Sequence, residues 1–204
     1  MNKSIVYLIC LMVLLFVGVT GCGPQDETRT LPYTRYVKSY DGARVPVPDH
    51  PKRILALSSA SDTILLGLVE PDRLVGINTL STYEEYSLEA KRAKLVKPAM
   101  SSYPLEKIIA LEPDLVIAPD YTSADVIAGL RHMGIPTVVV PTGTTVESVI
   151  KNVTDIAHIV GEDEKGQFYE QKIRRELEQM KRLGTSIPVN QRKSVLFVSS
   201  MDGY

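Results

Sequence analysis

The chain has 204 residues, a formal net charge of −1, and 44% hydrophobic and 23% charged residues. This length supports one domain with a sizeable core, and the charge gives no sign of a nucleic-acid partner. Both cysteines, Cys10 and Cys22, lie within the first 22 residues, which excludes a disulfide framework and a cysteine metal cluster from the rest of the chain.

The N-terminus predicts export followed by lipid attachment. Lys3 precedes an apolar run over residues 5–19, and small residues then lead to Cys22. The run has about 15–17 residues, at or below the roughly 17–25 that span a bilayer, so a plain transmembrane anchor is the weaker alternative. The pattern resembles a bacterial lipoprotein signal, in which residues 1–21 are removed and Cys22 is acylated. Residues 22–34 then form a flexible tether.

Strand and helix patterns alternate through the rest of the chain. Asp41-Gly42 predicts a hairpin of residues 36–40 and 44–48, whose second arm carries prolines and therefore lies at an edge. The alternation beyond it predicts a parallel sheet with right-handed crossovers. The predicted strands are residues 54–57, 74–77, 94–96, 115–118 and 136–140, and the predicted helices are residues 63–68, 104–111, 124–133 and 145–160.

Several polar residues precede these helices and are candidate N-caps. They are Ser61 or Asp62, Ser101 or Ser102 ahead of Pro104 at the first helical position, and Thr144 or Thr145.

A longer helix is predicted after Gly161. It starts at Glu162 or Asp163 and continues to Leu183, with one apolar stripe that predicts packing on one side only. Gly166, near its start, weakens the helix by about 1 kcal/mol relative to alanine. The apolar stripe of this helix consists of Phe168, Ile173, Leu177, Met180 and Leu183.

Residues 194–199 predict a further buried strand.

Four segments in the same order resemble those of the substrate-binding proteins of ABC importers. They are PKRILALSSASDTILLGL at 51–68, DRLVGI at 72–77, PLEKIIALEPDLVIAP at 104–119, and GIPTVVVPTGTTVESVIKNVTDIAHIVG at 134–161. The group most similar to this chain has two lobes joined by a long helix and carries iron–siderophore complexes, haem or cobalamin. The resemblance covers residues 36–198.

The resemblance implies an α/β fold. Residues 35–160 would form the N-terminal ligand-binding lobe, a parallel sheet flanked by helices, and residues 161–187 the connecting helix. Residues 188–204 would contain the first strand of a second lobe, so that we expect a truncated second lobe here.

The resemblance also implies a function. We expect a monomeric, extracytoplasmic, membrane-anchored receptor that captures a metal chelate, such as an iron(III)–siderophore complex, or cobalamin or haem, and delivers it to an ABC permease. The alternative is a single lobe that acts only as an interaction or sensing module for a membrane partner. Neither an enzyme nor a cofactor is expected, since the chain lacks a Gly-x-Ser-x-Gly elbow, a phosphate-binding loop and a Gly-x-Gly-x-x-Gly motif.

Candidate ligand-binding residues follow the predicted strands, because ligands of open parallel sheets bind outside the carboxyl ends of the strands. Hydroxyl and tyrosine side chains there suit a large polar chelate, although each of them is equally consistent with a solvated loop or a helix cap. The candidates are Ser58, Ser59 and Ser61; Asn78, Tyr83 and Tyr86; Met100, Ser101 and Tyr103; Asp120 and Tyr121; and Thr142 and Thr144.

Glu106 is a candidate for a different role. The resemblance matches it to an acid on the lobe surface that pairs with arginines of the permease, whereas the helix dipole alone also favours an acid in a first turn. The histidines His50, His132 and His158 are far apart in sequence and have no acidic or histidine partner at ligand spacing, so no metal site is expected.

Overall fold

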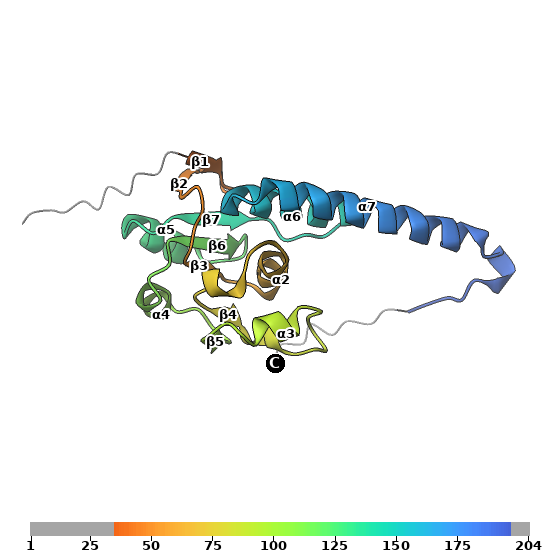
Figure 1. The fold of residues 1–204 in the computed structure, drawn as a ribbon, viewed down its shortest axis with the longest axis horizontal. Coiled ribbons are helices and arrows are strands. Elements are labelled where there is room, and N and C mark those ends of the chain that lie inside the picture. The colour runs from red at the N-terminus through yellow and green to blue at the C-terminus, as the bar shows by residue number, and fades with distance from the viewer. Residues whose placement is uncertain (1–34, 197–204) are drawn as a thin grey trace, which may run out of the picture. The chain divides into compact units, whose positions relative to one another are not determined.

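A small parallel sheet forms the centre of the protein in the computed structural model, which describes residues 35–196 (Figure 1). Three strands lie in the order β3–β6–β7, with both pairs parallel. β4 and β5 form a second parallel pair. The predicted parallel α/β fold is therefore confirmed. The strands are β3 (Ile54–Ala56), β4 (Ile77–Asn78), β5 (Ala99–Met100), β6 (Leu115–Pro119) and β7 (Thr137–Val140).

Helices cover both faces of this sheet, which is why its strands are apolar except for Thr137 in β7. Ile54 and Ala56 of β3 face a core that includes residues of α2 and α6, whereas Leu55 between them faces a core that includes Ile108 of α4 and Leu130 of α5. The helices are α2 (Ser59–Leu68), α4 (Leu105–Ala110), α5 (Ala124–His132) and α6 (Val146–Val160).

The predicted hairpin is present as β1 (Arg35–Lys38) and β2 (Arg44–Val47), and its turn protects the outer edge of β7. The backbone N–H of Tyr40 donates to the Val139 carbonyl at 3.0 Å, and the Val139 N–H donates to the Ser39 hydroxyl at 2.8 Å. Because these bonds occupy the backbone groups of an edge strand, they block pairing with another chain there.

The turn from α6 into α7 (Asp163–Ser186) places the two helices against each other (Figure 1). Gly161 ends α6 with a left-handed φ of 75°, which glycine adopts without strain. Within α7, all of which is described, Gly166 alone is buried. Tyr169 packs against the core of the lobe.

The predicted apolar stripe of α7 coincides only in part with its packed side. Phe168, Met180 and Leu183 are each more than half exposed among the described residues. Ile173 and Leu177 are half-buried. Gly166 and Tyr169 lie on the same side as Ile173 and Leu177, and this is the packed side, because a residue without a side chain lets α7 approach α6 closely.

Two helix starts differ from the prediction. α2 begins at Ser59 rather than at 63, because Ser58 takes an extended backbone conformation and its side chain accepts a hydrogen bond from the Ser61 N–H. Ser61 and Asp62 therefore lie inside the helix and are buried rather than capping it. In α4, Pro104 occupies the N-cap position rather than the first helical position, and no side chain caps it. Thr145 caps α6 as one of the two predicted candidates.

Three strand predictions also differ. Residues 94–96 form a turn after the short helix α3 (Ala90–Ala93), because the N–H groups of Lys94 and Val96 bond back to the carbonyls of Ala90 and Ala93. The strand expected at 74–77 is reduced to a bridge between Leu74 and Ile54 before β4 begins at Ile77.

The strand expected at 194–199 is absent from its described part, residues 194–196, which have no regular structure. Residues 197–204, the predicted signal sequence at 1–21, Cys22 and the predicted tether at 22–34 lie outside the described residues. Within the described part of the chain, no helix has the length and apolar character required to span a bilayer.

Candidate functional site

Several predicted ligand residues meet in one hollow at the carboxyl ends of β3, β6 and β7. Ser58, Ser59, Tyr121 and Thr142 all line it, and its volume is about 390 Å³. Because parallel strands end at the same edge, residues from three separate loops converge here. Ser61 also lines this hollow, whereas Asp120 and Thr144 do not.

The Ser58 hydroxyl is already occupied. It accepts from the Ser61 N–H at 3.2 Å and donates to the Ser61 hydroxyl at 3.0 Å, and Ser58 is only 7% exposed. Its role in the structure is to start α2, so the polar surface that the hollow offers a ligand comes mainly from Ser59, Tyr121 and Thr142.

Asp120 holds two walls of this hollow together. Its carboxylate accepts from the Thr142 hydroxyl at 2.6 Å and from the Thr142 N–H at 3.1 Å, which joins the loop after β6 to the loop after β7. These hydrogen bonds lower the pKa of the Asp120 carboxyl, which therefore stays ionised. Tyr121, next in the chain, is 72% exposed and its ring is free to contact a ligand.

Sequence analysis missed Asn152, which lines the same hollow from α6. The Asn152 amide donates to the Pro141 carbonyl at 2.8 Å, while its Oδ1 atom is buried without a partner among the described residues. The signal was present in the sequence, since Asn152 is a polar residue beside the apolar positions Ile150 and Val153.

The other predicted residues lie around β4 and β5 and do not line this hollow. Asn78 ends β4, and its side chain accepts from the Leu80 N–H at 2.9 Å to start a 3₁₀ turn. Tyr83 and Tyr86 follow as an edge-to-face pair with ring centroids 6.4 Å apart, exposed by 48% and 72%. Such rings present both an apolar face and a hydroxyl to solvent.

The residues after β5 differ in exposure. Met100 is 9% exposed and packs in the core cluster that contains Leu55, so it is a core residue in this structure. Ser101 is exposed, whereas the Tyr103 hydroxyl is buried and lies beside the Asn78 side chain. The ligand-binding roles of all these residues stay predictions.

Glu106 lies in the first turn of α4 and is exposed. None of the ion pairs found among residues 35–196 involves it, so its carboxylate is available at the surface. Glu106 does not line the hollow at the carboxyl ends of the strands.

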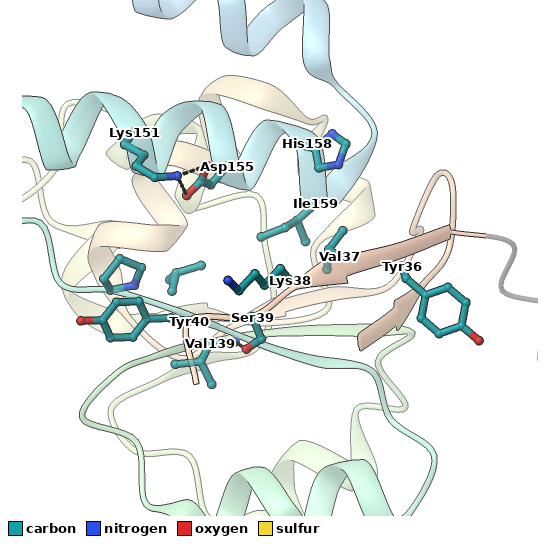
Figure 2. A pocket seen from close by; sticks show the side chains of 12 residues that line it. Tyr36, Val37, Lys38, Ser39, Tyr40, Val139, Lys151, Asp155, His158 and Ile159 are labelled. Atoms are coloured by element: carbon teal, nitrogen blue, oxygen red, sulfur yellow. Dashed lines mark hydrogen bonds and ion pairs between the residues drawn. The ribbon is translucent and has the colours of Figure 1, made fainter. Parts of the chain in front are cut away.

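A larger hollow, about 690 Å³, lies between the hairpin and α6 (Figure 2). Lys151 and Asp155 form an ion pair at 2.6 Å on its α6 side. None of the predicted ligand residues lines it. In the described part of the chain, no group of three or more histidine, cysteine or acidic residues is arranged to hold a metal ion.

Comparison with known proteins agrees with this architecture. The sequence model of a family described as "Periplasmic binding protein" matches residues 54–204. The chain is 28% identical over 203 residues to the uncharacterised ABC transporter substrate-binding lipoprotein YvrC of Bacillus subtilis (strain 168), which covers 94% of this chain and 62% of that protein. It is 31% identical over 134 residues to a vitamin B12-binding protein of Vibrio campbellii, which covers 64% of this chain and 46% of that protein.

A solved structure gives the same picture. A periplasmic solute-binding protein from Veillonella parvula superposes with a TM-score of 0.64 at 21% identity, over 76% of this chain and 50% of that one. The chain thus spans about half to three fifths of the length of these relatives. The match covers most of the chain, and the chain belongs to the periplasmic binding protein family.

Proposed function

We propose that this chain is the N-terminal, ligand-capturing part of an extracytoplasmic substrate-binding protein of an ABC importer. The observation that supports this best is the hollow at the carboxyl ends of β3, β6 and β7, which occurs in a chain of the periplasmic binding protein family. The family is one of binding proteins, and the relatives described above are named as binding proteins rather than enzymes.

The proposed ligand is a large metal chelate: cobalamin, haem or an iron(III)–siderophore complex. No charged side chain lines the hollow, and hydroxyl, amide and phenol groups stand there beside apolar residues, while the exposed tyrosine pair offers two further uncharged rings; this suits a bulky ligand with little net charge. The relative from Vibrio campbellii is named for vitamin B12 binding, which supports a corrinoid as the first candidate.

Binding is tested by equilibrium dialysis of the chain against cyanocobalamin, haemin and a ferric trihydroxamate. We expect saturable binding of one of them, and a Tyr121→Ala variant that binds it at least about tenfold more weakly, equivalent to roughly 1.4 kcal/mol. Tyr36→Ala is the matched control, because Tyr36 is also an exposed tyrosine but lies on the hairpin, outside this hollow. No binding of any probe, or equal losses in both variants, would contradict the proposal.

Glu106 is proposed to dock on the membrane permease. An exposed carboxylate in a first helical turn without an ion-pair partner among the described residues is available to a basic surface. We expect Glu106→Ala to reduce copurification with the permease from membranes of the source organism without changing ligand affinity. Glu164→Ala is the control, since Glu164 is an exposed acid in the first turn of α7. The same loss in both variants would refute a specific role for Glu106.

Anchoring through Cys22 completes the proposal. Mass spectrometry of the protein isolated from membranes should find an acylated N-terminal Cys22, and Cys22→Ala should abolish acylation. The resemblance of residues 1–22 to a lipoprotein signal and the naming of the Bacillus relative as a lipoprotein support this step. A lone lobe that docks on a membrane partner without trapping ligand is the less favoured alternative, and ligand binding by the chain would rule it out.

A further inference from the structure

One carboxyl group of the protein is buried where no cation balances it. Asp62, in the first turn of α2, is 1% exposed. Its Oδ2 atom accepts from the Asn78 N–H at 2.7 Å and from the Ser81 hydroxyl at 2.9 Å. Its Oδ1 atom has no partner among the described residues, and no lysine, arginine or histidine there bonds to it.

The two donors belong to the segment that carries the exposed tyrosine pair. Asn78 ends β4, and Ser81 lies in the 3₁₀ turn Thr79–Thr82. The Tyr83 N–H closes this turn by donating to the Leu80 carbonyl at 3.2 Å. The carboxyl of Asp62 therefore fastens α2, at the end of β3, to the loop after β4, and it is the only side chain seen to bond both Asn78 and Ser81 in residues 35–196.

Tyr103 is the titratable group that faces Asp62 from the segment after β5. Burial raises the pKa of the Tyr103 phenol, the Asp62 charge raises it further, and the Asn78 side chain opposes this rise. The Tyr103 hydroxyl is thus neutral, and it is buried beside the Asn78 side chain. The Tyr103 hydroxyl and the Asp62 Oδ1 atom are not hydrogen-bonded to each other, so a proton on Asp62 would act by removing a buried charge that no cation balances.

We propose that Asp62 is a positioning residue whose bound proton keeps the Asn78–Tyr86 segment closed over the ends of β4 and β5. An ionised carboxylate at this buried place has two donors at Oδ2 but none at Oδ1 and no cation beside it among the described residues, and opening of the segment is the route by which water reaches it. The consequence for ligand capture, tighter binding at mildly acidic pH, rests on the proposed function. The effect on the segment itself does not.

The expected pH range follows from linkage. Burial raises the pKa of Asp62 from 3.8 to about 7, against the opposing effect of the Asn78 and Ser81 hydrogen bonds. In an opened segment the carboxyl regains its ordinary pKa. The equilibrium constant for opening therefore rises about tenfold per pH unit between these two pKa values, and it stays constant above the higher one.

The test is hydrogen exchange of the ligand-free chain, followed at the Asn78 and Leu80 amides between pH 5 and pH 8. Protection factors should fall by about tenfold per pH unit and then level off near pH 7, without sensitivity to low urea, because a local opening exposes little surface. Asp62→Asn, which keeps both accepted hydrogen bonds but cannot ionise, should give a flat profile. Ser81→Ala removes a donor to the carboxylate and should move the levelling point to higher pH.

A flat wild-type profile, or the same fall in Asp62→Asn, would overturn the proposal. So would a fall that appears only together with urea-sensitive global unfolding. If Asp62→Asn does not fold, the direction of the Ser81→Ala shift still decides, because a purely structural hydrogen bond would lower protection at every pH without moving the levelling point. Since no ligand takes part, failure here leaves the proposed transport function untouched, and failure of the chelate panel leaves this result untouched.

Discussion

Gly166 gives the sharpest test of how α6 and α7 fit together. Helix propensity alone predicts that Gly166→Ala stabilises the protein by about 1 kcal/mol. A Cβ atom at this position, however, would lie 2.5 Å from the Ala157 Cβ atom and 3.6 Å from the Thr154 Cα atom. Neither neighbouring atom belongs to the mobile end of a long side chain, so the two helices themselves must move apart.

The two effects differ in size. Overpacking of a fitted contact costs about 1–3 kcal/mol, and the propensity gain recovers about 1 kcal/mol of this. We therefore expect Gly166→Ala to lower the free energy of unfolding by up to about 2 kcal/mol. Gly184 is the matched control in the same helix, since a Cβ atom there meets nothing within 4 Å. Gly184→Ala should stabilise the protein by up to about 1 kcal/mol.

Urea unfolding followed by circular dichroism measures both changes, provided that the slope with denaturant stays constant. Adding Ala157→Gly to Gly166→Ala returns space to the contact, so the double variant should lose less stability than the sum of the two single variants by at least about 0.5 kcal/mol. Equal stabilisation by Gly166→Ala and Gly184→Ala would refute the close helix contact.

Three further predictions concern stability. Gly161→Ala should destabilise strongly, by about 2 kcal/mol or more, because its Cβ atom would lie 2.1 Å from the Asp49 carbonyl oxygen at a φ of 75°; thermal unfolding measures the loss, and a change below about 0.5 kcal/mol would contradict it. Arg131, 2.7 Å from Asp41, is the main cause that lowers the Asp41 pKa to about 2. The ion pair between Arg131 and Asp41 should stabilise the fold by roughly 1 kcal/mol or less after screening. This contribution should be present above about pH 4 and vanish toward pH 2. Comparison of urea midpoints of wild type and Asp41→Asn tests this, and a difference that persists at pH 2 would contradict it. Thr145→Ala removes the α6 cap and should cost about 1 kcal/mol, a loss that Thr145→Ser should largely restore in the same assay.

Local patterns predicted the central elements well, because they record burial directly. The run Leu115–Pro119 is apolar at every position, and the structure buries all of it between helices on both faces of the sheet. The Asp41-Gly42 pair predicted its hairpin because few residues other than glycine adopt the φ of 87° found at Gly42.

Sequence patterns failed where tertiary contacts decide. Val96 is apolar and buried, as a strand residue would be, but backbone bonds to the preceding helix α3 fix it in a turn. Asp62 looked like a helix cap, and its burial depends on donors from Asn78 and Ser81, which lie many residues away. Gly166 looked like a weak point of α7, whereas the fit against α6 depends on it.

Strand order determines how large a ligand must be to use the whole predicted site. The hollow with Tyr121 lies at the ends of β3, β6 and β7, while the Tyr83–Tyr86 pair follows β4 on the other side of β3. With neighbouring strands about 4.8 Å apart, β4 and β6, on the two sides of β3, lie roughly 10 Å apart. A corrinoid or a porphyrin can approach this span, but a small oxyanion cannot. Alanine substitutions at Tyr121 and Tyr83 should therefore both weaken binding of a large chelate, whereas a small ligand would depend on only one of them.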